Sequence, residues 1–176
     1  MSWRTKLKFS ISDTNFIPKR LKELRILSHQ NAIVGIQENA SEKLQMIAGV
    51  QEFGCDITVT PKQRRYLHSQ GLHLKSNTVK IVIPQRSYIR STADDGQALN
   101  KLKDRVEFAI YALLEGLKNG KYVLNAAGTS MQGSIQERIG KGIPPQLHEF
   151  TVSRKGSTVP LINKGKLLNA IKVAIK

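Results

Sequence analysis

The stretch from Asp94 to Lys118, DDGQALNKLKDRVEFAIYALLEGLK, decides the expected fold class. Its apolar residues recur every three or four positions, which is the spacing of one face of an α-helix. They are Leu99, Leu102, Val106, Ala109, Leu113 and Leu117. Asp94 and Asp95 stand where they can cap this helix, and Lys118 stands where a helix dipole favours a cation. We therefore expect the longest helix here, with Gly120 as its stop signal.

The segments before this helix alternate between strand and helix patterns. In chain order they predict a strand at 7–11, a helix from 17, a buried strand at 32–36, a helix around 44–51, a helix from 61 to about 71, and a strand at 79–83. Asn15 is a candidate cap for the helix that Ile17 and Pro18 open. Gly54 is expected to end the helix around 44–51. Phe53, next to that glycine, is expected to anchor the helix end in the core.

The segments after the long helix complete a mixed pattern. Apolar residues between Ala127 and Ile139 predict one more helix, which Gly140 and Gly142 would end. The alternation of Ile171, Val173 and Ile175 with polar or small residues predicts a terminal strand. No repeat or linker divides the chain. We expect a single α+β domain over 1–176, in which a small mixed or antiparallel sheet packs against one long helix and several short helices.

Positive charge is the strongest compositional signal. The 176 residues contain 28 Lys and Arg against 13 Asp and Glu, a formal net charge of +15. No acidic residue lies between Asp56 and Asp94, or after Glu149. Such a balance favours polyanions or acidic protein surfaces as partners, although the lysines could also serve only solubility.

Residue patterns for catalysis and metal binding are missing from the sequence. Cys55 is the single cysteine, which excludes a disulfide framework and a cysteine-based zinc site. The four histidines have no ligand spacing, and the paired acids Asp94 and Asp95 are explained by capping. The sequence has neither a nucleophile elbow nor a phosphate-binding P-loop. We therefore expect no enzymatic activity, no cofactor and no metal.

Targeting and nucleic-acid signals are also weak. The first residues lead into no apolar region of a secretory signal, and no apolar run reaches the length of a membrane span. A soluble protein without a membrane partner is expected. The cluster from Lys62 to Tyr66 could contact phosphates, although it is equally typical of a solvated helix face. A basic nucleic-acid-binding protein therefore remains an alternative.

Several motifs, taken in order, resemble one known family. They are Val34-Gly35-Ile36, Gln51-Glu52-Phe53-Gly54, Thr60 to Leu67, Ile83 to Arg90, Pro144-Pro145, Thr151 to Gly156, and Pro160 to Leu167. The set is similar to the virion morphogenesis and tail-completion proteins of tailed bacteriophages, which join head to tail at the neck. The resemblance spans residues 32 to 176. The chain departs from the family pattern at Gln85 and Ser87, where a second proline is common, and at Asn163-Lys164-Gly165, which replaces an acidic pattern.

The resemblance implies a structural virion protein that completes the tail or neck as part of a homo-oligomeric ring, with sixfold symmetry as the leading expectation. Its partners would be a connector or adaptor ring and a tail terminator or tube, and it would be assembled in the host cytoplasm. Its basic stretches would face DNA in the channel or acidic protein. The candidate contact residues are Arg64, Arg65, Arg86, Arg90, Arg154 and Lys155. Arg154 and Lys155 are expected to project from a loop.

Overall fold

The computed structural model describes residues 15–176, and the strand expected at 7–11 lies outside them. This part of the chain holds eight helices and two small antiparallel sheets of two strands each. The elements are α1 (Ile17–His29), β1 (Ala32–Ile36), α2 (Glu42–Phe53), β2 (Cys55–Thr58), α3 (Pro61–Ser69), β3 (Lys80–Ile83), α4 (Arg90–Ala93), α5 (Gly96–Leu114), α6 (Gly120–Lys141), α7 (Glu149–Lys155), α8 (Lys166–Ala170) and β4 (Ile171–Ile175). The α+β class expected from the sequence is confirmed.

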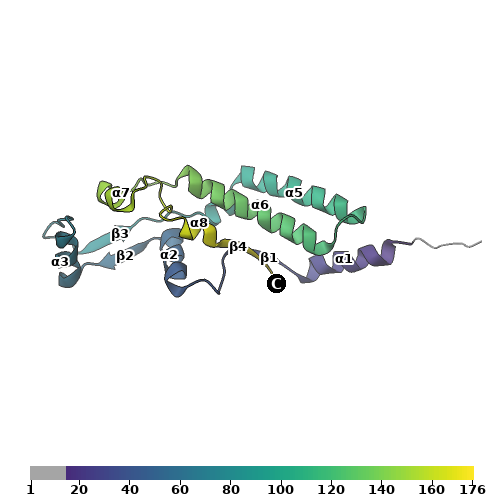
Figure 1. The fold of residues 1–176 in the computed structure, drawn as a ribbon, viewed down its shortest axis with the longest axis horizontal. Helices are drawn as coiled ribbons and strands as arrows, with labels where there is room; N and C mark the ends of the chain where they lie inside the picture. The colour runs from purple at the N-terminus through teal and green to yellow at the C-terminus, as the bar shows by residue number, and fades with distance from the viewer. Residues whose placement is uncertain (1–14) are drawn as a thin grey trace, which may run out of the picture.

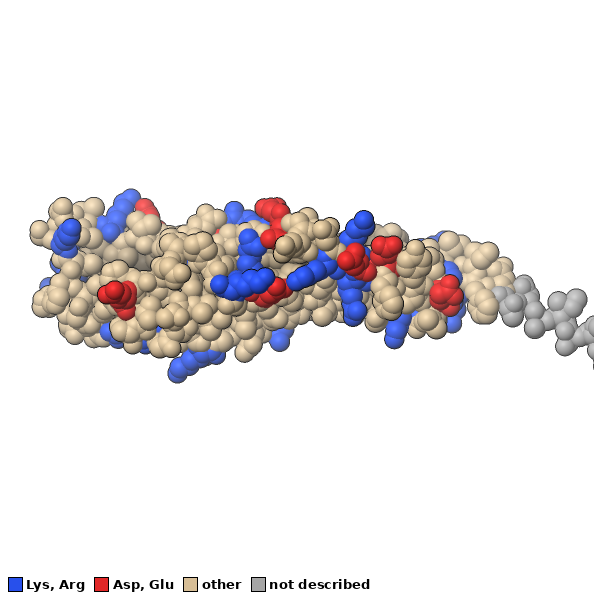
Figure 2. Space-filling view, turned by 90° about the horizontal axis from the view of Figure 1, so that it is seen from above, with Lys and Arg blue, Asp and Glu red and all other residues tan. Residues whose placement is uncertain are grey.

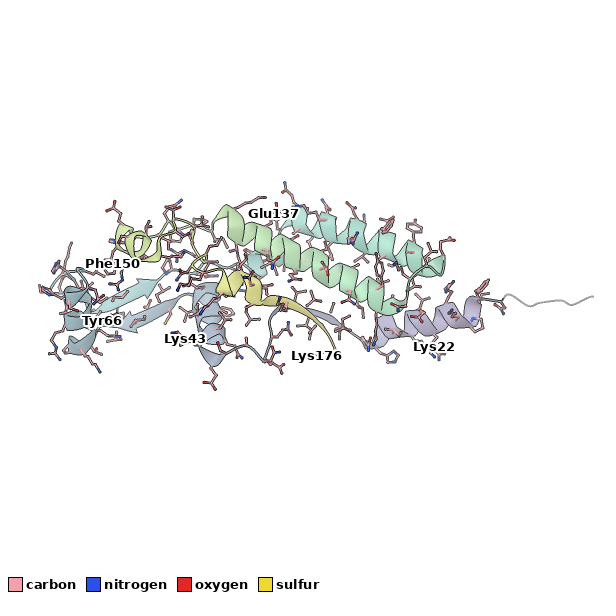
Figure 3. All side chains as sticks on the ribbon, in the orientation of Figure 1. Lys22, Lys43, Tyr66, Glu137, Phe150 and Lys176 are labelled. Atoms are coloured by element: carbon pink, nitrogen blue, oxygen red, sulfur yellow. The ribbon has the colours of Figure 1, made fainter. Side chains whose placement is uncertain are left out.

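The elements are strung out along one long axis (Figure 1). The β2–β3 hairpin and α3 form one end, and α1 forms the other. Helices α5 and α6 pack side by side, and α6 also covers the sheet of β1 and β4. Tyr66 and Phe150 lie at the hairpin end in Figure 3, far from Lys22 on α1. The fold therefore has two separate ends that can face different neighbours.

The terminal strand predicted at 171–175 is confirmed. It pairs antiparallel with β1, and Val34 lies opposite Val173 in the register. Gly128 of α6 packs on this strand so closely that a Cβ atom there would overlap the side chain of Val173. The sequence places the glycine where helix and sheet touch.

The described chain has two small hydrophobic cores. The first joins α2, α6, α8 and β4 through Ala48, Tyr88, Ile135, Ile139, Leu167 and Ile171. The second lies between α5 and α6 and consists of Ala109, Leu113, Val123 and Ala126. Four of the six apolar residues expected on one face of this helix are not fully buried in α5. Leu99 is 44% exposed, Leu102 and Val106 are partly buried, and Leu117 lies beyond the helix and is 74% exposed.

The longest helix is α6, with 22 residues, and not α5, with 19. Gly120, expected as a stop signal, is the first residue of α6. Its backbone approaches α1, and its N–H donates to the Glu23 carboxylate at 2.9 Å. Asn119 caps the new helix by accepting the Tyr122 N–H at 2.9 Å. Tertiary contact with α1 thus explains a glycine that local pattern assigned to a C-terminus.

Three further local expectations are wrong. Strand β1 is not buried, because only Gly35 within it is inaccessible and Ile33 is 43% exposed. A two-stranded sheet covered on one face leaves the other face open. Phe53 is 64% exposed and does not anchor α2 in the core. Arg154 and Lys155 lie in the last turn of α7, not on a loop.

The residues predicted to lie at the ends of helices agree more closely with the structure. The N-cap of α1 is Phe16 and not Asn15, although the Asn15 side chain, one residue earlier, accepts the Ile17 N–H at 3.1 Å. Asp95 is the N-cap of α5 and accepts the N–H groups of Gln97 and Ala98, both at 3.0 Å. Gly54 ends α2 with a φ of 76°, which glycine adopts readily. Helix ends that depend on adjacent residues, such as Asp95 and Gly54, therefore lie where the sequence predicts them.

Candidate functional site

Arg64 braces the loop that connects α3 to β3. Its guanidinium donates to the backbone oxygens of Lys75 at 2.8 Å and Thr78 at 2.6 Å. Helix α3 begins with a capping box in which Thr60 and Gln63 exchange hydrogen bonds, which fixes the first turn of the helix that carries Arg64. Arg64 therefore has a structural role, whereas its neighbour Arg65 is exposed and available to a partner.

Glu52 is the centre of a buried polar cluster. Its side chain belongs to α2 and the residue is 4% exposed. The carboxylate accepts the Ser87 hydroxyl at 2.6 Å and the backbone N–H groups of Tyr88 at 2.7 Å and Ile89 at 3.0 Å. It also accepts the backbone N–H and Nε of Arg90, both at 3.1 Å. The carboxylate therefore holds the whole segment that leads into α4.

The surroundings of Glu52 keep it charged. Burial alone would raise the pKa of this carboxyl, but the bonds from the Ser87 hydroxyl and three backbone N–H groups outweigh it and lower the pKa. Burial, with the Glu52 charge beside it, raises the pKa of the Tyr88 phenol to about 12. A carboxylate engaged by five donors has little capacity left to act as a base or a ligand, so we assign it to structure.

Arg90 links this cluster to the surface. Its side chain is half exposed and lies over the ring of Phe53, with 4.5 Å between the guanidinium carbon and the ring centroid. Phe53 therefore forms an outer platform for a cation instead of a core anchor. The two motifs at 51–54 and 83–90 meet in space here, although the chain separates them by about thirty residues.

Arg86 is the most buried of the six candidate cations, with 6% exposure. Its Nε and Nη2 donate to the Pro145 carbonyl at 3.1 and 2.9 Å. Burial lowers the pKa of its guanidinium. Within residues 15–176 no carboxylate forms an ion pair with it. A buried cation satisfied only by carbonyl oxygens favours an anion nearby.

Lys155 lies near Arg86, and Arg154 points elsewhere. The Lys155 ammonium donates to the Val159 carbonyl at 2.6 Å. Burial first, and then the Arg86 charge, lower the pKa of this ammonium. Arg154 donates to the Gln70 side chain and lies over the Phe150 ring at 5.6 Å, so it joins α7 to the end of α3. Of the six candidate residues, Arg86 and Lys155 therefore line one cavity. Arg64, Arg90 and Arg154 instead form hydrogen bonds that hold neighbouring segments together.

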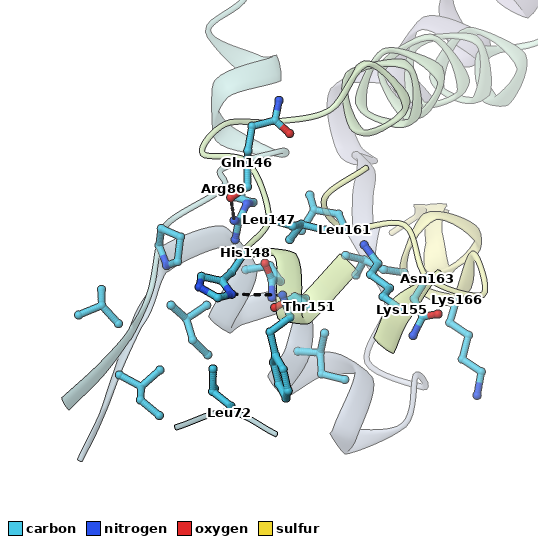
Figure 4. Close-up of a pocket in the computed structure, with 18 of the residues that line it drawn as sticks. Leu72, Arg86, Gln146, Leu147, His148, Thr151, Lys155, Leu161, Asn163 and Lys166 are labelled. Atoms are coloured by element: carbon cyan, nitrogen blue, oxygen red, sulfur yellow. Dashed lines mark hydrogen bonds between the residues drawn. The ribbon is translucent and has the colours of Figure 1, made fainter. Parts of the chain in front are cut away.

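Arg86 and Lys155 line an open cavity of about 990 Å³, which we name the basic groove (Figure 4). Its walls come from α2, β3, α7, α8 and the loops between them. Lys155, Asn163 and Lys166 lie on one side in Figure 4, opposite Leu72. The apolar part of the lining includes Leu44, Ile47, Leu72, Ile83, Leu161 and Leu167. The groove is large enough for several apolar side chains of a ligand or partner.

Charge in the basic groove has one sign. Four cations line it, namely Arg86, Lys155, Lys164 and Lys166, and no aspartate or glutamate is among the described residues that do. Sequence reasoning selected only two of these four. The sequence shows that the stretch after Glu149 lacks acids, but it does not show that Lys164 and Lys166 in this stretch line one cavity with residues of the acid-free strand β3.

A second surface lies on the side of α5 that faces away from its core, and we name it the acidic face. It consists of Asp104, Glu107, Phe108, Tyr111 and Glu115, which recur at helical spacing opposite the buried Ala109 and Leu113. Phe108 and Tyr111 are each 62% exposed. Among the ion pairs of residues 15–176 none involves its three carboxylates. Exposed aromatic rings with carboxylates beside them are typical of a surface that meets a partner, although exposed Lys103 and Arg105 lie at the edges of this face.

Two kinds of site are absent from the part of the chain that the structure describes. It holds no group of three or more His, Cys, Asp or Glu side chains placed to bind a metal ion. None of its helices combines the length and the apolar character that a membrane span requires.

No protein-family model matches the chain, and comparisons with curated proteins and with solved structures give no match either. The surfaces of the described residues and the order of the sequence motifs are therefore what bears on the function of the chain.

Proposed function

We propose that this chain is a structural virion protein of a tailed bacteriophage, which completes the neck or tail and joins head to tail as part of a ring. It would bind copies of itself, the connector or adaptor ring and the tail terminator or tube. The motif order in residues 32 to 176 supports the phage assignment. The role as an assembly component is supported by the surface of the folded chain.

The observation that best supports a role in an assembly is the large surface area that the chain leaves exposed. Its accessible area is 13045 Å², whereas a compact monomer of 19.7 kDa exposes about 8,600 Å². Residues 1–14 can account for at most about 2,300 Å² of this area, and a compact chain the size of residues 15–176 exposes about 8,100 Å², so roughly 2,600 Å² of excess remains. Obligate assemblies bury a few thousand Å² in their interfaces, which is of the same order.

The exposed surface is also apolar in many places. Large hydrophobic side chains are at least a third exposed on α1, α2, α3, α5 and β3. Phe16, Leu21, Met46, Val82, Phe108 and Leu114 are examples from these elements or their caps. Contiguous exposed apolar patches are rare on monomeric proteins and mark surfaces that partners cover. Neighbouring subunits along the long axis would cover them.

The charge pattern fits the same role. Figure 2 shows basic side chains along the length of the molecule, with acidic ones between them over the half that carries α5. Several of the six candidate cations make structural bonds, which leaves Arg65 as the freest of them for a polyanion. A nucleic-acid-binding regulator is the weaker alternative, because the order of the motifs in residues 32 to 176 supports a phage assembly protein.

Gold-labelled antibodies against the chain test the proposal on intact phage particles. We expect label at the junction of head and tail and none on the capsid surface. Label absent from particles, together with tight duplex binding that falls steeply with added salt, would favour the regulator instead.

A further inference from the structure

The basic groove and the acidic face have complementary chemistry. The groove offers four cations around an apolar cavity, with no described acid in its lining. The acidic face offers two exposed aromatic rings, Phe108 and Tyr111, among three carboxylates without ion-pair partners in the described chain. Aromatic anchors that enter a pocket and charges that meet at its rim are the usual parts of a specific protein interface.

The two surfaces cannot meet within one molecule. The groove lies between α2, β3, α7 and α8, towards the hairpin end. The acidic face lies on α5, and the core between α5 and α6 is on the opposite side of that helix. A contact between them must therefore join two copies.

We propose that the acidic face of α5 in one copy docks into the basic groove of the next copy. Phe108 and Tyr111 enter the apolar cavity, and Glu107 and Glu115 meet Lys164 and Lys166 at its rim. The contact uses a different surface on each partner, so it propagates head to tail and closes into a ring when the rotation per subunit allows. This inference rests on the proposed function for the closure into a ring. The contact between the two surfaces does not depend on that function.

Ionic strength decides when this contact forms. At low salt the net charge of +15 per copy opposes association. At about 0.15 M salt the Debye length is only about 8 Å, so repulsion between distant charges is screened while charges in direct contact still attract. Self-association is therefore expected to strengthen from low to physiological salt, and to weaken again at high salt.

A charge-exchange experiment on the full chain tests the pairing. Variant one carries Glu107→Lys and Glu115→Lys, and variant two carries Lys164→Glu and Lys166→Glu. All four side chains are exposed and make no described ion pair, so both variants should fold. Sedimentation velocity at physiological salt is expected to show self-association weakened about tenfold in each variant alone.

Mixing the two variants is the decisive arm. Each then supplies the surface that the other has lost, and we expect association of the mixture to return to within about threefold of the wild type. The matched control Lys22→Glu with Lys121→Glu changes two exposed lysines outside both surfaces and should neither weaken association nor rescue variant one. If this control restored association with variant one, net charge alone would explain the rescue, and the proposed pairing of the two surfaces would be wrong.

Two other outcomes also overturn the inference. One is a wild-type chain that stays monomeric at every concentration and salt tested. The other is unchanged association in Phe108→Ser with Tyr111→Ser, because the aromatic rings would then lie outside the contact. In either case a foreign acidic segment becomes the occupant of the groove. Neither result bears on whether the chain joins heads to tails, which the particle experiments test separately.

Discussion

Glu52 on α2 accepts the backbone N–H of Tyr88 at 2.7 Å, across 36 residues of chain. This bond and its neighbours hold the entry to α4, and Tyr88 in turn is buried to 1% exposure in the larger core. The Tyr88 hydroxyl donates back to the Ala48 carbonyl on α2 at 3.4 Å. One carboxylate thus joins the middle of the chain to the core on which the basic groove is built.

Glu52→Gln should destabilise the fold strongly. The amide would turn an N–H group towards donors that now meet a carboxylate oxygen, at a cost of about 2–4 kcal/mol. Chemical denaturation followed by circular dichroism measures the change. Glu42→Gln, an exposed position on the same helix, should cost no more than about 0.5 kcal/mol. Equal effects of the two substitutions would contradict the role given to Glu52.

The stability of the protein should fall in acid in a way that depends on Glu52. The pKa of its carboxyl is lowered in the folded protein from the ordinary 4.5. Its contribution is therefore fully present above pH 4.5 and is lost as the pH falls through the lower folded value. The free energy of unfolding, measured from neutral pH downwards, should decline more steeply for the wild type than for Glu52→Gln. Parallel curves would show that other carboxyls cause the decline.

Gly128→Ala should weaken the packing of α6 on β4. The new methyl group would overlap Val173, a stiff side chain on the strand, at a cost of about 1–3 kcal/mol. Gly133→Ala on the same helix meets no atom within 4 Å and should stabilise by about 0.5–1 kcal/mol. Adding Val173→Ala to Gly128→Ala should recover part of the loss. Thermal denaturation of the four chains checks these signs.

Removing residues 166–176 should abolish cooperative folding. The segment carries the buried Leu167 and Ile171, and its strand supplies all the pairing that β1 has within the described chain. Two fully buried aliphatic side chains alone contribute roughly 3–6 kcal/mol, which approaches the whole stability of a typical domain. A chain ending at residue 165 that unfolds cooperatively near the full-length midpoint would contradict the assignment of β4 to the core.

Local signals in the sequence predicted most elements of this fold. Asp95 caps α5 and Gly54 ends α2 because their hydrogen bonds and backbone angles depend on adjacent residues. Gly120 was wrongly predicted to end a helix, because the glycine is required by a tertiary contact, the close approach of α1. Strand β2 was not predicted from the sequence. It has only four residues, and their side chains alternate between partly buried and exposed, so the hydrophobic alternation is too short to recognise.

The candidate site was harder to predict than the fold. Charge runs pointed to Arg86 and Lys155, but not to the apolar walls that make their surroundings a groove. Those walls come from segments distant in the chain, such as Leu44 and Leu161, and their meeting depends on the whole topology. Phe53 was expected in the core because aromatic residues usually bury, whereas here it carries the Arg90 guanidinium on the surface.

Head–tail joining in the absence of the chain is the most direct test of its function. Heads and tails would be isolated from phage in which the gene for this protein is disrupted, and purified chain added back. We predict that joined, infectious particles return with the wild-type chain, and that Phe108→Ser with Tyr111→Ser folds at the normal midpoint but fails to restore them. Heads and tails that join equally well without the chain would contradict the account.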